Sequence, residues 1–118
     1  AAFAPQPGFA VYAATKSYVY SFSLALRWEL REKEILVTAV CPGPVDTAFF
    51  ERAEGDAGST KEALRVRPEE VVKKALADSK KGKAVSVYGI PIKAARAAAK
   101  FVPKDFAAMI MQMINKRG

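Results

Sequence analysis

The longest helical pattern covers about residues 10–33, where apolar side chains recur at helical spacing and neither glycine nor proline interrupts. Its middle is apolar and hydroxyl-rich, so we expect more than one face of this helix to pack against other structure. A second helix is predicted from Pro68 to the basic end near Lys80. Proline suits the first turn, and Glu69 and Glu70 complement the positive end of the helix dipole.

Two short apolar runs predict strands. Residues 35–41 are almost continuously apolar and are stopped by Pro42 and Gly43, which favours a strand covered on both faces inside a parallel sheet. Residues 84–88 predict a second strand, ended by Gly89. Between the strands, residues 44–67 are polar and interrupted by glycine, so we expect a long mobile loop with a short helical piece near residues 48–53.

The order helix, strand, helix, strand predicts one right-handed crossover unit of an α/β fold. A strand as apolar as residues 35–41 needs hydrogen-bonding neighbours on both edges, and a two-stranded sheet is marginally stable. We therefore expect the chain to lack part of its own sheet. Residues 1–89 form this α/β part, and residues 90–118 form a separate helical tail.

Composition excludes several classes of chemistry. The 118 residues are 51% apolar and 26% charged, which is typical of a globular chain. The single cysteine, Cys41, can form no internal disulfide, so we expect a reducing, cytoplasmic location and interpret Cys41 as a buried strand residue rather than a redox thiol. With no histidine and no cysteine cluster, we expect no metal site, and acid–base chemistry falls to Tyr, Lys, Asp or Glu.

The positive charge lies toward the C-terminus, since residues 1–79 sum to −1 and residues 80–118 to +8, which together give the net charge of +7. A basic terminal segment indicates an anionic surface or partner, rather than nucleic acid bound by the whole fold. Pro103 divides this tail into two helical pieces. The tail is either an amphipathic helix that lies on a membrane or binds a lipid-like substrate, or a terminal helix that covers a cleft or an oligomer contact. Its basic stripe is Lys93, Arg96, Lys100 and Lys104, and its apolar face is Phe106, Met109, Ile110, Met113 and Ile114.

Tyr12 and Lys16 are the strongest candidates for chemistry. A spacing of four places the phenol and the ammonium on one helix face, where both can reach the same ligand. A cation about 4 Å from a phenol stabilises the phenolate by roughly 4 kcal/mol at an effective dielectric near 20, before solvent screening. Alone, this spacing is also typical of a solvated helix edge.

The combination of motifs is more specific. Tyr12, Lys16, the long apolar helix, the strand, Pro42–Gly43 and Thr47 follow one another as in the short-chain dehydrogenase/reductase family, and residues 3–90 resemble the C-terminal half of such an enzyme. The resemblance implies a Rossmann-like, doubly wound parallel sheet and an oxidoreductase that uses NAD or NADP. It also implies hydride transfer between the nicotinamide and a small-molecule carbonyl or alcohol substrate.

The same resemblance assigns roles to individual residues. Tyr12 is the general acid, or the base in the reverse direction, and Lys16 supports the phenolate and hydrogen-bonds the nicotinamide ribose. Pro42 and Gly43 let the backbone pass close to the nicotinamide. Val45 offers main-chain groups to the carboxamide, and Thr47 hydrogen-bonds the carboxamide or the pyrophosphate. Residues 48–67 resemble the variable substrate lid.

Three features of the family are missing: a glycine-rich dinucleotide turn, an Asn-Asn-Ala-Gly-like element, and a catalytic serine at a position that precedes Ala1. We therefore expect the isolated chain to be an inactive fragment, and the choice between NAD and NADP stays open. The family also implies a homo-oligomer that pairs through residues 10–33. The alternative is a non-catalytic oligomerisation or membrane-surface module.

Overall fold

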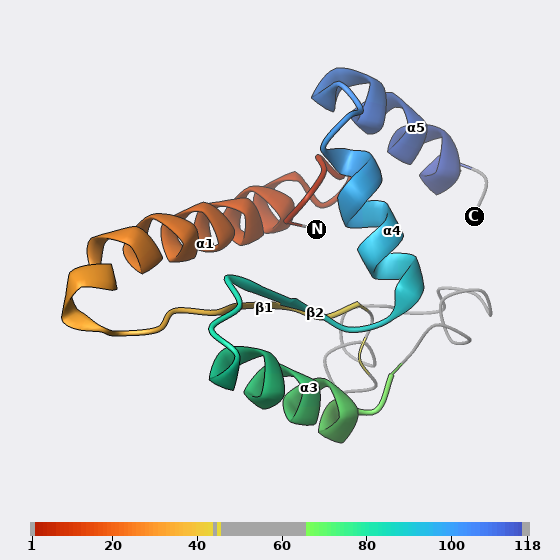
Figure 1. Ribbon diagram of the computed structural model, residues 1–118. Helices are drawn as coiled ribbons and strands as arrows, with labels where there is room; N and C mark the ends of the chain where they lie inside the picture. Colours follow the sequence, from red (N-terminus) through yellow and green to blue (C-terminus); the bar gives the residue numbers. More distant parts are fainter. Residues whose placement is uncertain (1, 44, 46–65, 117–118) are drawn as a thin grey trace.

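The chain folds into helices arranged around a small parallel sheet (Figure 1). The computed structural model describes residues 2–43, 45 and 66–116. Within these residues the chain forms four helices and two strands, together with a short 3-10 turn. The helices are α1 (Ala10–Glu29), α3 (Pro68–Lys80), α4 (Ile90–Ala99) and α5 (Lys104–Lys116), the strands are β1 (Ala39–Cys41) and β2 (Val85–Val87), and the 3-10 turn is η1 (Arg31–Lys33).

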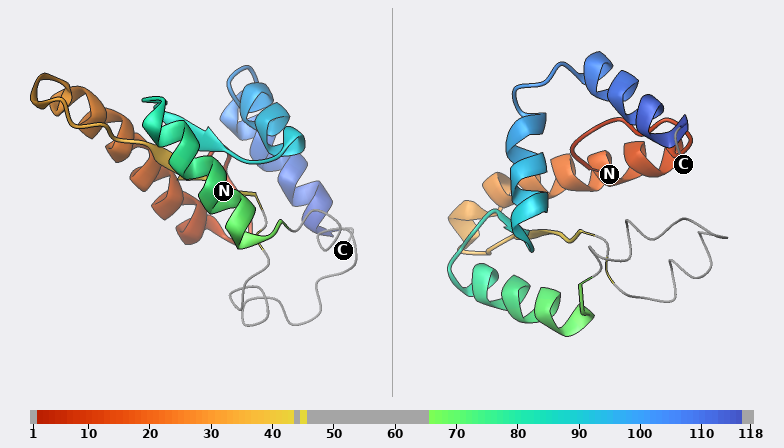
Figure 2. Two further views of the ribbon diagram at one scale, coloured as in Figure 1. Left: turned by 60° about the horizontal axis from the view of Figure 1, so that its bottom comes forward. Right: turned by 90° about the vertical axis from the view of Figure 1, so that its right-hand side faces the viewer.

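The strands pair in parallel, with Ala39 opposite Val85 and Cys41 opposite Val87. Because α3 connects them, β1, α3 and β2 form the crossover unit that the sequence predicts. The helix α3 packs on one side of the sheet and α1 lies on the other, which two directions of view show (Figures 1 and 2). The prediction of an α/β arrangement with parallel strands is confirmed, and the sheet formed by the described residues has two strands.

The first helix is shorter than predicted. We expected it to continue to Lys33, but α1 ends at Glu29 and the chain tightens into the 3-10 turn. Glu34 then adopts a left-handed conformation with φ of 56°, which reverses the chain toward β1. The helical periodicity of the sequence continues through this turn, so it did not reveal the end of the helix.

The first strand is also shorter than predicted. Of residues 35–41, β1 includes only Ala39–Cys41, and Leu36 is 58% exposed. The expectation that both faces are covered is wrong within the described chain, since Ala39 is buried while the neighbouring Val40 is 48% exposed. With β2 as its one described partner, β1 has too few neighbours to extend the ladder.

Arg27 ties α1 to the loops that lead into both strands. Its guanidinium donates one hydrogen bond to the carbonyl oxygen of Val37 at 3.1 Å and another to that of Gly82 at 2.7 Å. A planar guanidinium can serve two carbonyls at once, which a lysine cannot do with the same geometry. The side chain therefore fixes α1 relative to the start of each strand.

Asp78 joins α3 to β2. Its buried carboxylate accepts hydrogen bonds from the ammonium groups of Lys74 at 2.7 Å and Lys83 at 2.8 Å, and from the hydroxyl of Ser86 at 2.9 Å. These hydrogen bonds, from Lys74 first, hold the pKa of the Asp78 carboxyl well below its usual value. A fully satisfied buried carboxylate favours a single arrangement of α3 on the sheet.

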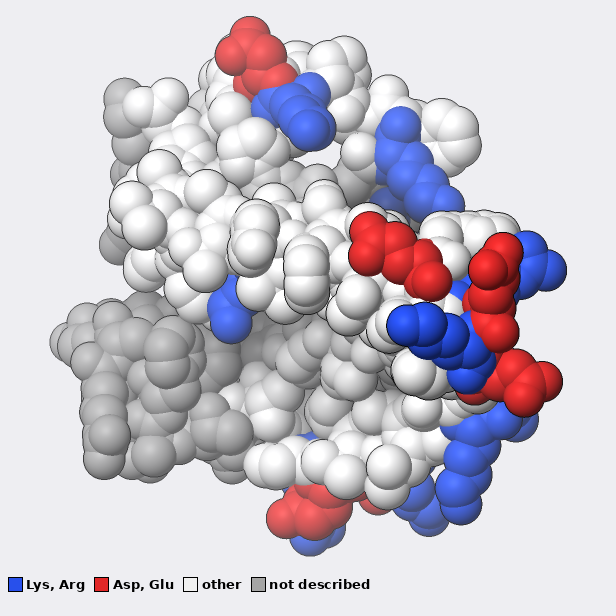
Figure 3. All heavy atoms as spheres, turned by 90° about the vertical axis from the view of Figure 1, so that its left-hand side faces the viewer, with Lys and Arg blue, Asp and Glu red and all other residues white. Residues whose placement is uncertain are grey.

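Few apolar side chains are buried in the described chain, whose buried hydrophobic residues are Ala13, Ala39, Val71 and Val87. We expected several faces of α1 to be packed, yet Val11 is 82% exposed and Phe22 is 53% exposed. Figure 3 shows one side of the molecule, where residues without charge fill much of the middle and most Lys, Arg, Asp and Glu side chains lie at the right, with others at the top and bottom. Exposed large apolar side chains, such as those of Val11 and Phe22, mark interaction surfaces where they form a contiguous patch.

Candidate functional site

Tyr12 and Lys16 lie next to each other near the start of α1. The Lys16 ammonium is 5.3 Å from the centroid of the Tyr12 ring, which is the geometry of a cation–π contact. Both residues are exposed, with Tyr12 at 40%. The predicted convergence of a phenol and an ammonium on one helix face is therefore present, and both side chains are accessible to a ligand.

The direction of α1 brings this pair to the carboxyl-terminal end of the sheet. The chain reverses between α1 and β1, so the start of the helix lies at the same end of the molecule as the end of β1 (Figure 1). Tyr12 is also in the first turn of α1, where the helix dipole favours negative charge. In open α/β sheets, ligands bind at the carboxyl ends of the strands.

The Pro42–Gly43 turn directly follows β1, as the sequence predicts. Pro42 is exposed and Gly43 is half-buried. Val45 forms an isolated parallel bridge with Val66, so the two ends of the intervening segment meet beside the sheet. Thr47 and residues 48–65, which include the expected helical piece and most of the expected lid, lie outside the described residues.

Gly43 makes a close contact that sequence reasoning missed. A Cβ at this position would lie 2.7 Å from Cγ1 and 3.0 Å from Cδ1 of Ile92 in α4. The glycine is therefore needed for the close approach of α4 to the turn, whatever else approaches its backbone. No local signal pairs two residues so far apart in the sequence.

Cys41, at the end of β1, is half-buried. Burial raises the pKa of its thiol, while the positive charge of Arg96 opposes that shift. A thiol with a raised pKa holds little thiolate near neutral pH and reacts slowly. This environment favours the interpretation of Cys41 as a structural residue.

The tail forms two helices that meet at Pro103, and this prediction is confirmed. From α4, the guanidinium of Arg96 reaches the hydroxyl of Tyr20 in α1 and donates a hydrogen bond of 3.4 Å. The sequence pattern placed Arg96 in the basic stripe but did not predict its contact with Tyr20. In α5, by contrast, the predicted apolar face is open to solvent. Its exposed side chains are Phe106 at 50%, Met109 at 43%, Ile110 at 38%, Met113 at 56% and Ile114 at 58%.

No helix in the described ranges is both long and apolar enough to cross a bilayer. Acidic, cysteine and histidine side chains form no group of three suited to a metal ion in that part of the chain.

Comparison with known proteins indicates the same family as the Tyr12–Lys16 motif. Residues 1–57 match the family model of the short chain dehydrogenases, and this segment contains Tyr12, Lys16 and the Pro42–Gly43 turn. An uncharacterized short-chain type dehydrogenase/reductase, y4eK of Sinorhizobium fredii, is 45% identical over 58 residues, which cover 49% of this chain and 23% of that protein.

Two further relatives extend the comparison. The uncharacterized oxidoreductase DltE of Bacillus subtilis is 37% identical over 82 residues, covering 70% of this chain and 32% of DltE. The 17-beta-hydroxysteroid dehydrogenase type 3 of Mus musculus is 40% identical over 47 residues, covering 40% of this chain and 15% of the enzyme. The chain thus spans a third or less of the length of these relatives. No solved structure gives a significant match.

Proposed function

Since residues 1–57 belong to the short-chain dehydrogenase family, we propose that the chain is the catalytic tyrosine–lysine part of an NAD(P)-dependent oxidoreductase. The enzyme interconverts a carbonyl and an alcohol. The observation that carries this proposal is the contact between the Lys16 ammonium and the Tyr12 ring within the matched segment. In the same proposal β1 and β2 are the last strands of a doubly wound parallel sheet, residues 1–89 are the C-terminal half of that domain, and residues 90–118 are its basic tail.

Tyr12 acts as the general acid. Its hydroxyl protonates the oxygen of the substrate carbonyl as hydride arrives at the carbon, and in the reverse direction the phenolate accepts the proton of the alcohol. Lys16 keeps a positive charge beside Tyr12, with its ammonium 5.3 Å from the centroid of the ring. Both side chains are exposed, so a substrate can reach them without a rearrangement of α1.

The residues present fit a nicotinamide dinucleotide in part. An exposed ammonium beside an exposed phenol can hydrogen-bond ribose hydroxyls, and Pro42, Gly43 and Val45 offer a turn and main-chain groups after β1. Thr47, which the family resemblance assigns to the same cofactor, lies outside the described residues. At Gly43, however, the Ile92 side chain fills the adjacent space. When bound, the cofactor supplies or accepts the hydride.

The test is a matched pair of tyrosine substitutions in the complete protein. Turnover of NADH and NADPH is measured with a panel of ketones and aldehydes for Tyr12→Phe and for Tyr18→Phe, an exposed tyrosine of the same helix. Tyr12→Phe removes the proton donor and lowers turnover about 100-fold or more while cofactor affinity changes little. Tyr18→Phe leaves turnover unchanged. Full activity in Tyr12→Phe would refute the assigned role.

We further propose that the 118-residue chain is inactive by itself, because its sequence has no glycine-rich dinucleotide turn to hold the cofactor's phosphates. Titration of NADH and NADPH into this chain, with mass measured in parallel, gives no binding isotherm at micromolar concentrations. The complete protein does bind. Tight binding by the short chain would show that copies of the chain can assemble a cofactor site together.

A second candidate function is a non-catalytic oligomerisation or membrane-surface module, and the exposed apolar side chains favour it. On α1, Val11 is 82% exposed, and Tyr18 stacks on Phe22 at 6.0 Å while both face solvent. Light scattering of a Tyr18→Glu and Phe22→Glu double variant tests whether α1 pairs two copies of the chain. Pelleting with anionic vesicles, with and without residues 90–118, tests whether the tail binds membranes.

A further inference from the structure

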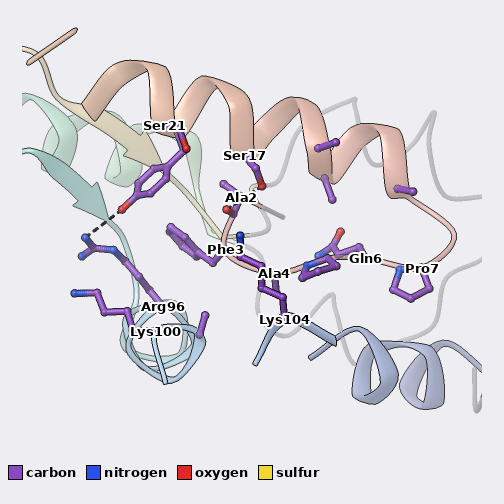
Figure 4. A pocket seen from close by; sticks show the side chains of 16 residues that line it. Ala2, Phe3, Ala4, Gln6, Pro7, Ser17, Ser21, Arg96, Lys100 and Lys104 are labelled. Carbon is purple, nitrogen blue, oxygen red and sulfur yellow. Dashed lines mark hydrogen bonds between the residues drawn. The ribbon is translucent and has the colours of Figure 1, made fainter. Parts of the chain in front are cut away.

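A cavity of about 610 Å³ lies between the N-terminal segment, one face of α1, and α4 with the start of α5 (Figure 4). This volume is in the range of small-molecule sites in proteins. Its α1 wall is made by Ala10, Ala13, Ala14, Ser17, Tyr20 and Ser21, which recur three and four residues apart. These residues therefore occupy one helix face.

The cavity is separate from the Tyr12–Lys16 pair. At 100° per residue, Tyr12 and Lys16 project about 100° or more away from the centre of the face that lines the cavity. Neither residue is part of its wall. A ligand in the cavity is therefore not the substrate of the reaction proposed for Tyr12.

Three cations line the cavity, and no acidic side chain joins them in the lining that the structure describes. Arg96 and Lys100 come from α4 and Lys104 begins α5. Figure 4 shows Arg96 and Lys100 together on one helix, across the cavity from the α1 residues Ser17 and Ser21. Within the described ranges none of the three cations forms an ion pair. Lys100 and Lys104 are exposed and Arg96 is half-buried, so all three are available to an anionic ligand.

Arg96 has hydrogen-bonding capacity left over. One of its terminal nitrogens donates to the Tyr20 hydroxyl at 3.4 Å, a long hydrogen bond, while its buried Nε has no partner among the described residues. A buried donor without a partner costs free energy, and a ligand oxygen would remove that cost. Arg96 and Lys100 also line a second hollow of about 350 Å³, whose one acid, Asp78, is already engaged by Lys74 and Lys83.

The rest of the wall is mostly apolar. Phe3, Ala4, Pro5 and Pro7 of the N-terminal segment contribute apolar side chains to it, and Phe3 packs edge-on against the Tyr20 ring of α1 at a centroid distance of 5.5 Å. An apolar body beside a cluster of cations is complementary to a molecule that has an apolar chain and an anionic head.

We propose that this cavity binds an amphipathic anion, such as a medium-chain carboxylate, with its head at Arg96, Lys100 and Lys104 and its chain along Ala13 and Ala14. The site goes beyond the oxidoreductase function, because it uses a different face of α1. It stands whether or not Tyr12 is catalytic.

The test is titration of the 118-residue chain with decanoate, below its micelle concentration, followed by amide NMR signals. Decanol and inorganic phosphate are titrated separately, since they supply the chain and the charge alone. Decanoate shifts the signals of Ala13, Ser17 and Ala99 and binds more tightly than either control. Decanol binding as tightly as decanoate overturns the proposal, and so does a decanoate response confined to residues 106–114 of α5.

A matched pair of lysine variants separates the cavity from general attraction to a chain of net charge +7. Lys104 lines only the larger cavity and Lys93 only the smaller hollow. Lys104→Gln weakens decanoate binding about fivefold, and Lys93→Gln weakens it less than about twofold. Ala14→Phe fills the cavity, leaves every charge in place and abolishes binding. Unchanged affinity in Ala14→Phe, or a larger loss in Lys93→Gln than in Lys104→Gln, contradicts the proposal.

Discussion

The guanidinium of Arg27 and the carbonyl oxygen of Gly82, 55 residues apart in sequence, are joined by a hydrogen bond of 2.7 Å. Gly82 has a φ of 67°, so the turn that presents this carbonyl adopts a conformation that glycine tolerates best. The same guanidinium binds the carbonyl of Val37. One side chain of α1 thus fixes the approach to both strands.

Removal of Arg27 should lower stability more than removal of its neighbour Arg31. Arg27→Met leaves two carbonyls without their charged donor, which costs about 2 kcal/mol of the unfolding free energy. Arg31 stacks on the exposed Trp28, so Arg31→Met costs less than about 0.5 kcal/mol. Urea unfolding followed by circular dichroism measures both. Equal losses would show that the two carbonyl contacts are not stabilising.

The Asp78 carboxylate predicts a loss of stability in acid. Its hydrogen bonds lower its pKa in the folded state, so its contribution is fully present above the unfolded-chain value of about 4. That contribution is lost as the pH falls from there toward the lower folded-state pKa. Thermal unfolding of the parent chain and of Asp78→Asn should therefore differ by several degrees at pH 7 and converge as the pH falls below 4. The same difference at both pH values would exclude this linkage.

Gly43→Ala should be destabilising because of Ile92. The added methyl group would meet Ile92 at 2.7 Å, an overlap that costs about 1–3 kcal/mol. Ile92→Ala removes both atoms in that contact. In the double variant the glycine substitution should consequently cost much less than it does alone, which a double-mutant cycle of unfolding free energies measures. Additive losses would assign the cost to backbone conformation instead.

Cys41 should react slowly with iodoacetamide near neutral pH. Burial raises the pKa of its thiol, and Arg96 partly opposes that rise. Replacement of Arg96 by Gln removes the opposing charge, so the midpoint of the rate against pH should move further up. The midpoint is the readout, because the limiting rate at high pH also depends on access. A midpoint that moves down would contradict the assigned electrostatics.

The sequence predicted the elements whose signals are local. Proline and two acids in its first turn marked α3, and Pro103 marked the division of the tail between α4 and α5. The length of the strand at residues 35–41 was overestimated. A continuous apolar run is typical of a strand that lies between neighbours in a larger sheet, and its length follows those neighbours. In the described residues one neighbouring strand supports only Ala39–Cys41. The apolar pattern of a strand does not reveal how many other strands lie beside it.

The candidate site likewise has contacts that the sequence predicts and contacts that it does not. Tyr12 and Lys16 are four residues apart on one helix, so their proximity follows from helical geometry alone. The contact between Gly43 and Ile92, and the reach of Arg96 to Tyr20 across 76 residues, depend on how α4 packs against the rest of the chain. Neither has a periodic signature. Only the folded arrangement reveals them.

The Asp78 contacts also bear on the order in which the chain folds. Ser86 lies eight residues from Asp78, so α3 and β2 can join after closing a short loop, whereas pairing of Ala39 with Val85 must close a much longer one. Short closures are fast and cost little entropy. The segment from α3 to β2 is therefore suited to form first and to act as the template on which β1 finds its register. Amide hydrogens in that segment should therefore exchange with solvent more slowly than those of the rest of the chain, because the segment is the last to unfold locally.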